Sequence, residues 1–255
     1  GTGPADAKAR FRIGESNGSQ LYGMPGSKLT GHIQSGLFQG ISGTLNWQYH
    51  PWLAGTASIG DPVQAVSFEE LSGNLKAQII APKKLSDDIK LLPGAEGALT
   101  VTLQDGKPHQ YSGTVEFSFK DFAEGQATVG GEMLDFDNLA GASVLKVVKD
   151  YTFPGQSNTS LTAGGALAVT VENSTIESFT GKTNVKYAGW LEGTVDAKAG
   201  SSFADGVTGR VKGPLTGTPA EQSSGDLKMT KGGTGVVDLV TGNTPTAFEV
   251  GSEVN

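Results

Sequence analysis

Aromatic and histidine side chains that could hold a ligand are concentrated in one hexapeptide. Residues 47–52 read Trp-Gln-Tyr-His-Pro-Trp, which brings Trp47, Tyr49, His50 and Trp52 within six positions. Such a loop could stack on a planar ligand or a carbohydrate, and His50 could serve as an axial ligand of haem. Packing within the fold is a second interpretation. Contact with a partner protein is a third, because Trp and Tyr are favoured in protein interfaces.

Metal-binding and catalytic patterns are weaker. Asp135, Asp137 and Asn138 resemble part of a calcium loop, but Leu139 occupies a position that the EF-hand pattern reserves for Asp or Asn. The sequence contains no nucleophile-elbow, zinc-protease or P-loop motif. We therefore expect a protein that is not an enzyme and carries no cofactor. A polysaccharide hydrolase stays open as an alternative, because the 26 acidic residues could supply a pair of catalytic carboxylates.

Composition narrows the class of protein and of partner. The chain has 255 residues, 38 glycines, no cysteine and a net charge of −7. The 19 basic residues are scattered, whereas nucleic-acid binding requires a basic stripe, so we expect no nucleic-acid partner. No apolar run approaches the roughly 18 residues of a membrane-spanning helix. The expected partners are the chain itself, as a homo-oligomer or polymer, or other surface or particle proteins.

Alternating apolar and polar residues with glycine at the bends predict the elements that must position these groups. The pattern indicates an all-β fold, an antiparallel β-sandwich or β-barrel or both, built of hairpins with at most one or two short helices. A hairpin is expected around Gln104–Lys107, and the best helix candidate is 86–92, with Ser86 as its N-cap. A phrase of a large apolar residue followed by glycine returns at 37–45, 68–75, 119–125, 176–181 and 203–209. Its spacing is too irregular for a solenoid of fixed period.

The Pro-, Gly- and Ser-rich stretch near 154–159 is the best linker by composition. It predicts an N-terminal β domain over 1–153 and a C-terminal β domain over 160–255, with one continuous domain as the alternative. Asn17, Asn158 and Asn173 each begin a glycosylation sequon, of which Asn158 in the linker would be the best acceptor.

Residues 7–13 form the cleanest alternating run. Ala7, Ala9, Phe11 and Ile13 would line one face of a strand, and the basic residues between them would line the other. The simple interpretation is the first strand of an ordinary sheet. The alternative is an assembly strand that is donated to a neighbouring subunit.

Two stretches resemble known β proteins, although no family is identified. Tyr111–Phe119, followed by Gly125 and 129–131, is similar to hairpins of surface-lipoprotein barrels, which implies capture of transferrin or haem. Leu99–Met133, with its Gln-Asp-Gly turn, is similar to tubular virion proteins such as phage tail tubes, which implies assembly. Each resemblance covers less than a third of the chain and rests on general β patterning.

The sequence therefore predicts a non-enzymatic structural β protein at an extracellular, cell-surface or virion location. It would assemble through strand edges and aromatic loops into a filament, a surface layer or a virion component. The absence of an initiating Met ahead of Gly1 indicates a removed leader or an added cloning sequence. The alternative function is a cell-surface β-barrel module that binds haem or carbohydrate with the aromatic loop.

Overall fold

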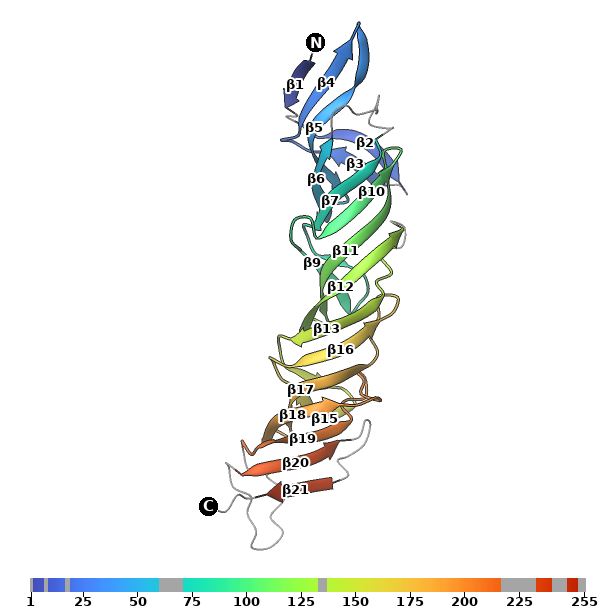
Figure 1. Ribbon diagram of the computed structural model, residues 1–255. Helices are drawn as coiled ribbons and strands as arrows, with labels where there is room; N and C mark the ends of the chain where they lie inside the picture. The colour runs from blue at the N-terminus through green and yellow to red at the C-terminus, as the bar shows by residue number, and fades with distance from the viewer. Residues whose placement is uncertain are drawn as a thin grey trace. The chain divides into compact units, whose positions relative to one another are not determined.

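All regular structure that the protein shows is β-strand. The computed structural model describes residues 2–6, 9–16, 19–59, 71–132, 137–216, 233–239 and 247–251. The strands in these segments pair antiparallel, and no helix occurs among them (Figure 1). The predicted all-β fold of antiparallel hairpins is confirmed. The barrel alternative is wrong, because the sheet does not close into a barrel.

Six strands recur in the same order three times, and we call each set of six a repeat. Repeat 1 contains β1 (Thr2–Asp6), β2 (Phe11–Ser16), β3 (Ser19–Gly23), β4 (Lys28–Gln34), β5 (Leu37–Tyr49) and β6 (Leu53–Ile59). Repeat 2 contains β7 (Gly73–Ile79), β8 (Lys83–Lys84), β9 (Ile89–Leu92), β10 (Leu99–Gln104), β11 (Lys107–Phe119) and β12 (Ala123–Glu132). Repeat 3 contains β13 (Gly141–Val147), β14 (Tyr151–Phe153), β15 (Gln156–Leu161), β16 (Ala166–Val171), β17 (Phe179–Tyr187) and β18 (Leu191–Ala197). A partial fourth repeat contains β19 (Gly209–Pro214), β20 (Thr234–Leu239) and β21 (Ala247–Gly251), which correspond to β13, β16 and β17.

The pairing registers establish the period of the repeats. The sixth strand of each repeat pairs with the first strand of the next, as β6–β7, β12–β13 and β18–β19. The residue pair Thr56↔Lys76 returns as Gln126↔Val144 and as Thr194↔Lys212. Equivalent residues therefore lie 70 positions apart between β6 and β12 and 68 apart between β12 and β18. The chain therefore repeats with a nearly constant period of 68 to 70 residues, although its recurrent phrases indicated an irregular spacing.

The turns recur with the same period. The fourth and fifth strands of each repeat are joined at Ser35–Gly36, Asp105–Gly106 and Asn173–Ser174, where both residues have positive φ. Two positive φ angles define a type I′ turn, whose twist matches the twist of paired strands. The fifth and sixth strands are joined by three residues, at 50–52, 120–122 and 188–190. The first of these three residues has a φ of 64°, 48° and 47°, respectively.

A short hairpin made of the second and third strands completes each repeat. The hairpins are β2–β3, β8–β9 and β14–β15, and their third strands pair with the long fifth strands β5, β11 and β17. The third strands contribute Leu21, Leu91 and Leu161 to the buried core. Each hairpin therefore adds apolar side chains to a sheet that would otherwise bury one face poorly.

The contacts divide the chain into two compact units. Unit 1 consists of residues 1–117 and 127–139, and unit 2 consists of residues 118–126 and 140–255. The chain passes from one unit to the other after residues 117, 126 and 139, all of which precede the stretch at 154–159. Within that stretch, Pro154 and Gly155 form the turn between β14 and β15, because Phe153 pairs with Gln156.

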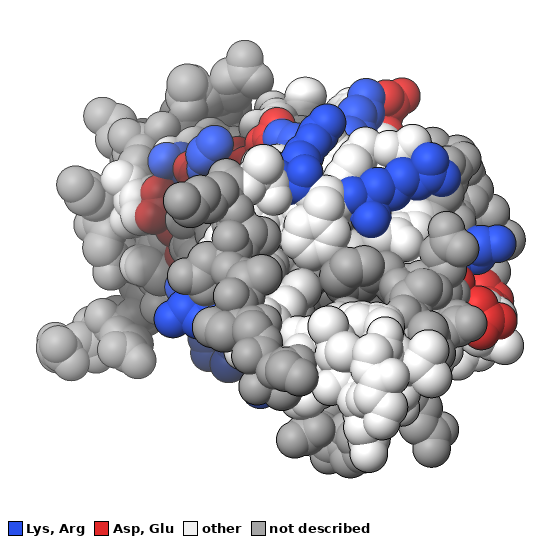
Figure 2. Space-filling model, turned by 90° about the horizontal axis from the view of Figure 1, so that it is seen from above, with Lys and Arg blue, Asp and Glu red and all other residues white. Residues whose placement is uncertain are grey.

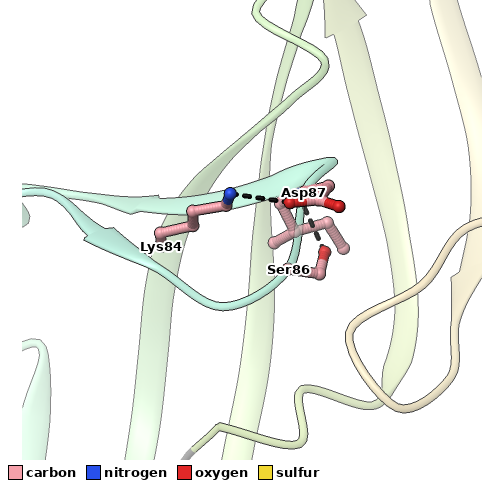
Figure 3. A network of polar contacts seen from close by, with 4 residues as sticks. Lys84, Ser86 and Asp87 are labelled. Atoms are coloured by element: carbon pink, nitrogen blue, oxygen red, sulfur yellow. Dashed lines mark hydrogen bonds and ion pairs between the residues drawn. The ribbon is translucent and has the colours of Figure 1, made fainter.

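The helix expected at residues 86–92 does not form. Ser86 still makes the hydrogen bond of an N-cap, since the Ile89 N–H donates to the Ser86 Oγ at 3.1 Å (Figure 3). Lys84 donates to the Asp87 carboxylate at 2.7 Å across the same turn. β9 follows, with Ile89 and Leu91 buried at the two-residue spacing of a strand. Pairing with β8 and β11 satisfies the backbone that a helix would have satisfied internally.

The alternating run at 7–13 is interrupted. β1 ends at Asp6, Ala9 is exposed outside any strand, and β2 begins at Phe11. Ile13 is buried and Phe11 is partly buried, whereas Ala7 lies outside the described residues. β1 pairs with β4 and β2 pairs with β3 of the same chain. The single strand expected at 7–13 is therefore wrong, while donation of a strand between subunits stays a prediction.

Candidate functional site

The aromatic hexapeptide occupies the end of β5 and the three-residue turn before β6. Trp47 and Tyr49 belong to the core of unit 1, with 1% and 3% of their surface exposed. Burial at alternate positions is what a strand with one covered face produces. His50 and Trp52 lie in the turn and are partly exposed. The structure thus separates the four residues into a buried pair and a surface pair, and only His50 and Trp52 are accessible to a ligand.

The surface pair is part of a continuous stack. The His50 and Trp52 rings are nearly parallel, with an interplanar angle of 11° and centroids 5.3 Å apart. The Lys83 ammonium lies 4.4 Å from the centre of the Trp52 ring, within cation–π range, and it also pairs with the Asp137 carboxylate. The Tyr49 and His50 rings meet edge to face, with centroids 4.3 Å apart. We call His50, Trp52, Lys83 and Asp137 the ring–cation stack.

The environment of His50 favours its neutral form. Burial lowers the pKa of His50 below its ordinary value, and the positive charge of Lys83 lowers that pKa further. The Asp137 carboxylate opposes both effects and raises the pKa of His50. A neutral imidazole stacked on an indole is a stable packing arrangement, and it keeps a nitrogen lone pair for coordination or hydrogen bonding.

The positions of Tyr49 and Trp52 are also aromatic in the other two repeats. Phe119 and Phe122 flank the turn after β11, with centroids 5.8 Å apart. Tyr187 and Trp190 flank the turn after β17, with centroids 5.6 Å apart, and each of these two pairs meets edge to face. An aromatic pair around the turn after the fifth strand is therefore a packing element of the repeat.

In repeats 1 and 2, a side chain from the second strand of the next repeat covers the aromatic residue of the turn. Tyr151 stacks on Phe122, with an interplanar angle of 18° and centroids 4.2 Å apart. Tyr151 lies 68 positions after Lys83, and Phe122 lies 70 positions after Trp52. Tyr151 therefore covers the turn of repeat 2 as Lys83 covers the turn of repeat 1. Among the three turns, the first alone contains a histidine.

The calcium candidates are not brought together as a set of ligands among the described residues. Asp137 pairs with Lys83, Asn138 is exposed, and Asp135 lies outside the residues that the structure describes. Within the described part of the chain, no group of three His, Asp or Glu side chains could hold a metal ion. The His109 Nδ1 lies 3.1 Å from the Glu132 Oε2, and both side chains are partly exposed.

Sequence reasoning missed an exposed apolar group on the β4–β5 hairpin. Ile33, Leu37 and Phe38 are among the few large apolar side chains that the described residues expose. The signal was the dipeptide Leu37-Phe38 immediately after the Ser35–Gly36 turn, where the other repeats have one apolar residue after a polar one.

Charged side chains are mixed on the face drawn in Figure 2. Lys and Arg side chains lie beside Asp and Glu side chains there, and a broad uncharged area adjoins them. No helix long and apolar enough to cross a membrane occurs among the described residues. No family model matches the chain, and no curated protein or solved structure matches it significantly.

Proposed function

We propose that this chain is a non-enzymatic structural protein in which tandem β repeats form a self-assembling scaffold. The proposal places it outside the cell, at a cell surface or in a virion, where a filament, surface layer or particle component would use such a scaffold. Assembly would proceed through strand edges and aromatic loops of neighbouring subunits.

One observation carries the proposal: the repeats share their backbone pairing and their packing, whereas their exposed turn residues differ. Registers, type I′ turns and turn aromatics are kept, while exposed turn residues change from His50-Pro51 to Lys120-Asp121 and Ala188-Gly189. Repeated units that each contact only their neighbours build extended surfaces, and such arrays serve widely as scaffolds. A catalytic site would instead require a particular set of surface residues at one place.

The strand edges offer a route to assembly. β17 pairs with β16 on one side and with β18 on the other, whereas its counterpart β21 pairs with β20 alone among the described strands. An open edge presents backbone donors and acceptors that another strand can pair with. β1 also has a single described partner, β4, but Pro4 lies within β1 and proline is typical of protected edges. We therefore assign assembly to the edge of β21.

Proline substitutions in β21 test this assignment. The N–H groups of successive residues in a strand point to opposite sides, so Phe248→Pro and Glu249→Pro remove one inward and one outward donor. We expect the full chain to form polymers in light scattering and negative-stain microscopy. One of the two proline variants should stay folded by circular dichroism and elute as a monomer. Glu249→Thr keeps the backbone donor and should polymerise normally.

Two results contradict the proposal at different levels. A wild-type chain that is monomeric at its highest soluble concentration contradicts self-assembly. Polymers that persist in both proline variants contradict the choice of the β21 edge.

A ligand-binding module is the second candidate, because the His50–Trp52 stack is partly exposed and His50 is unique among the equivalent turn residues. Trp47 and Tyr49 cannot contribute to such a site while buried. A haem or oligosaccharide titration followed by tryptophan fluorescence tests this candidate. A saturable change that His50→Ala or Trp52→Ala abolishes would favour binding, and the absence of any saturable change would exclude these two ligands.

A further inference from the structure

The β4–β5 hairpin ends in an apolar surface that we call the apolar tip, consisting of Ile33, Leu37 and Phe38. Ile33 and Phe38 are paired across the hairpin next to the type I′ turn. Their exposed fractions are 51% and 43%, and that of Leu37 is 68%. Exposed clusters of large apolar side chains mark places where another surface binds.

The other repeats bury the equivalent residues. Leu103 and Pro108 are the equivalent cross-strand pair in repeat 2, and both are buried. Val171 and Ile176 hold the same positions in repeat 3, with exposed fractions of 0% and 4%. The turns differ in the same way, since Gly106 and Ser174 are buried while Gly36 is exposed.

A short segment ahead of the first strand covers the tip in repeat 2. Gly73, the first residue of β7, pairs with Leu103, so Leu71 lies beyond the end of that pairing and is 6% exposed. The Gly106 N–H donates to the Leu71 carbonyl oxygen at 2.9 Å. The Asp105 N–H donates to the Ser72 Oγ at 3.1 Å. Leu71 and Ser72 thus cap both the apolar pair and the turn.

The covering segment recurs in sequence and in register. Gly141 pairs with Val171, and Gly209 pairs with Leu239. The residues two positions ahead of these glycines, Leu139 and Val207, are 4% and 0% exposed. The three segments read Glu-Glu-Leu-Ser-Gly, Asp-Asn-Leu-Ala-Gly and Asp-Gly-Val-Thr-Gly, ending at Gly73, Gly141 and Gly209. We call this five-residue pattern the cover segment. It consists of an acidic residue, any residue, Leu or Val, a small residue and glycine.

Repeat 1 shows no cover segment over its tip among the described residues. The described pairing of β1 with β4 ends at Thr2↔His32, one residue short of Ile33. A Cβ added to Gly36 would meet nothing within 4 Å, which places open space over the turn.

We propose that the apolar tip is a docking site for a further cover segment. The partner chemistry is an extended segment with an acidic residue, then Leu or Val two positions later, then a small residue and glycine. The apolar side chain would fill the space over Ile33 and Phe38, in the position that the buried Leu71 holds ahead of β7 in repeat 2. The site continues the interface that joins successive repeats within the chain, and it does not depend on polymer formation at β21.

A tethered cover segment tests the proposal, because tethering raises the effective concentration of a weak ligand. In repeat 2 the cover segment ends at Gly73, which pairs with Leu103, and the described pairing of β1 with β4 runs toward Ile33 and ends at Thr2↔His32. We therefore extend the full chain ahead of Gly1 by Phe-Asp-Asn-Leu-Ala, the sequence of residues 136–140. The matched control carries Asp in place of the Leu of the extension. Hydrogen exchange of the amides at 33–38 and fluorescence of an added apolar dye report burial of the tip.

We expect the Leu extension to slow exchange at the tip about tenfold relative to the Asp control, and to reduce dye binding. In the Leu-extended chain, Phe38→Ser should cancel the difference, since it removes the surface that the Leu would contact. Equal exchange and equal dye binding in the Leu and Asp extensions overturn the proposal. A difference that persists unchanged in Phe38→Ser also overturns it, because the extension would then act elsewhere.

Discussion

Replacing Gly55 by alanine tests the close approach between the sixth strand of one repeat and the first strand of the next. Gly55 lies in β6 opposite Ala77 of β7. A Cβ at Gly55 would overlap the carbonyl oxygen of Lys76, which is backbone and cannot rotate away. The equivalent Gly193 would place its Cβ against the Lys212 carbonyl oxygen in the same manner. Glycine at this position therefore permits the two strands to pair.

The expected loss of stability follows from the movement that the Cβ forces. Overpacking a well-fitted site costs about 1–3 kcal/mol. Moving β7 away from β6 also weakens the pairing of Leu53–Thr56 with 76–79, at about 1 kcal/mol for each hydrogen bond lost. We expect Gly55→Ala to lower the free energy of unfolding by about 3 kcal/mol. Gly193→Ala should behave alike. Gly125→Ala should cost less, because the atom nearest to its Cβ, at 2.7 Å, is a methyl carbon of Leu145 that can rotate.

Urea unfolding measures the change, and hydrogen exchange locates it, because repeats can open separately. Gly94→Ala is the control, since a Cβ there meets nothing within 4 Å and the residue does not have positive φ. It should change the free energy of unfolding by less than about 1 kcal/mol. A Gly55→Ala chain as stable as the Gly94→Ala chain, with unchanged exchange in β6 and β7, would refute the close-approach argument.

Two further substitutions test the candidate site. Trp47 is buried and its Nε1 has no hydrogen-bond acceptor, while Phe117 holds the equivalent position in repeat 2. Trp47→Phe should therefore change the free energy of unfolding, measured in urea, by less than about 1.5 kcal/mol. The reason is that removal of the unpaired N–H donor offsets the loss of buried apolar surface. A much larger loss of stability would show that the Trp47 Nε1 does have a hydrogen-bond acceptor. The pKa of His50 is lowered by folding, so the unfolded chain binds a proton more tightly and stability falls as pH drops below about 6.5. Thermal unfolding of wild type and His50→Gln should converge as the pH is lowered through that range, and parallel pH profiles would contradict the lowered pKa.

The strand content could be predicted because alternation is a local signal. The hairpin of β10 and β11 is an example, since Asp105-Gly106 is a favoured type I′ turn between two alternating runs. The helix expected at 86–92 failed because the hydrogen bond from Ile89 to Ser86 is common to an isolated turn and to a helix start. The choice between them depends on pairing with β11, a contact that no local pattern contains.

The period escaped sequence reasoning because the recurrent phrases mix different places in the repeat. The phrase at 119–125 covers the turn between the fifth and sixth strands, whereas the phrase at 203–209 leads into a first strand. Sampling both places makes the spacing look irregular. Comparison of Gly43, Gly113 and Gly181, all at positive φ, gives spacings of 70 and 68 residues directly.

The aromatic loop was located correctly, but its burial was not foreseen. Leu45, Trp47 and Tyr49 alternate along β5 and are buried together, so the same period-two rule could have separated them from His50 and Trp52. The stack of Lys83 and Asp137 on that loop could not be foreseen, because these residues are remote in sequence from Trp52.

Identical registers at successive repeat junctions give the chain a natural unit of length. Excising residues 73–140 would join residue 72 to Gly141, so that Thr56 would meet Val144 in place of Lys76 and every later pairing would keep its alignment. Unequal recombination could lengthen or shorten such a protein by whole modules without passing through a misaligned intermediate. An insertion of an odd number of residues within a strand would shift the following side chains to the wrong face, which favours a nearly constant spacing while the surface residues diverge.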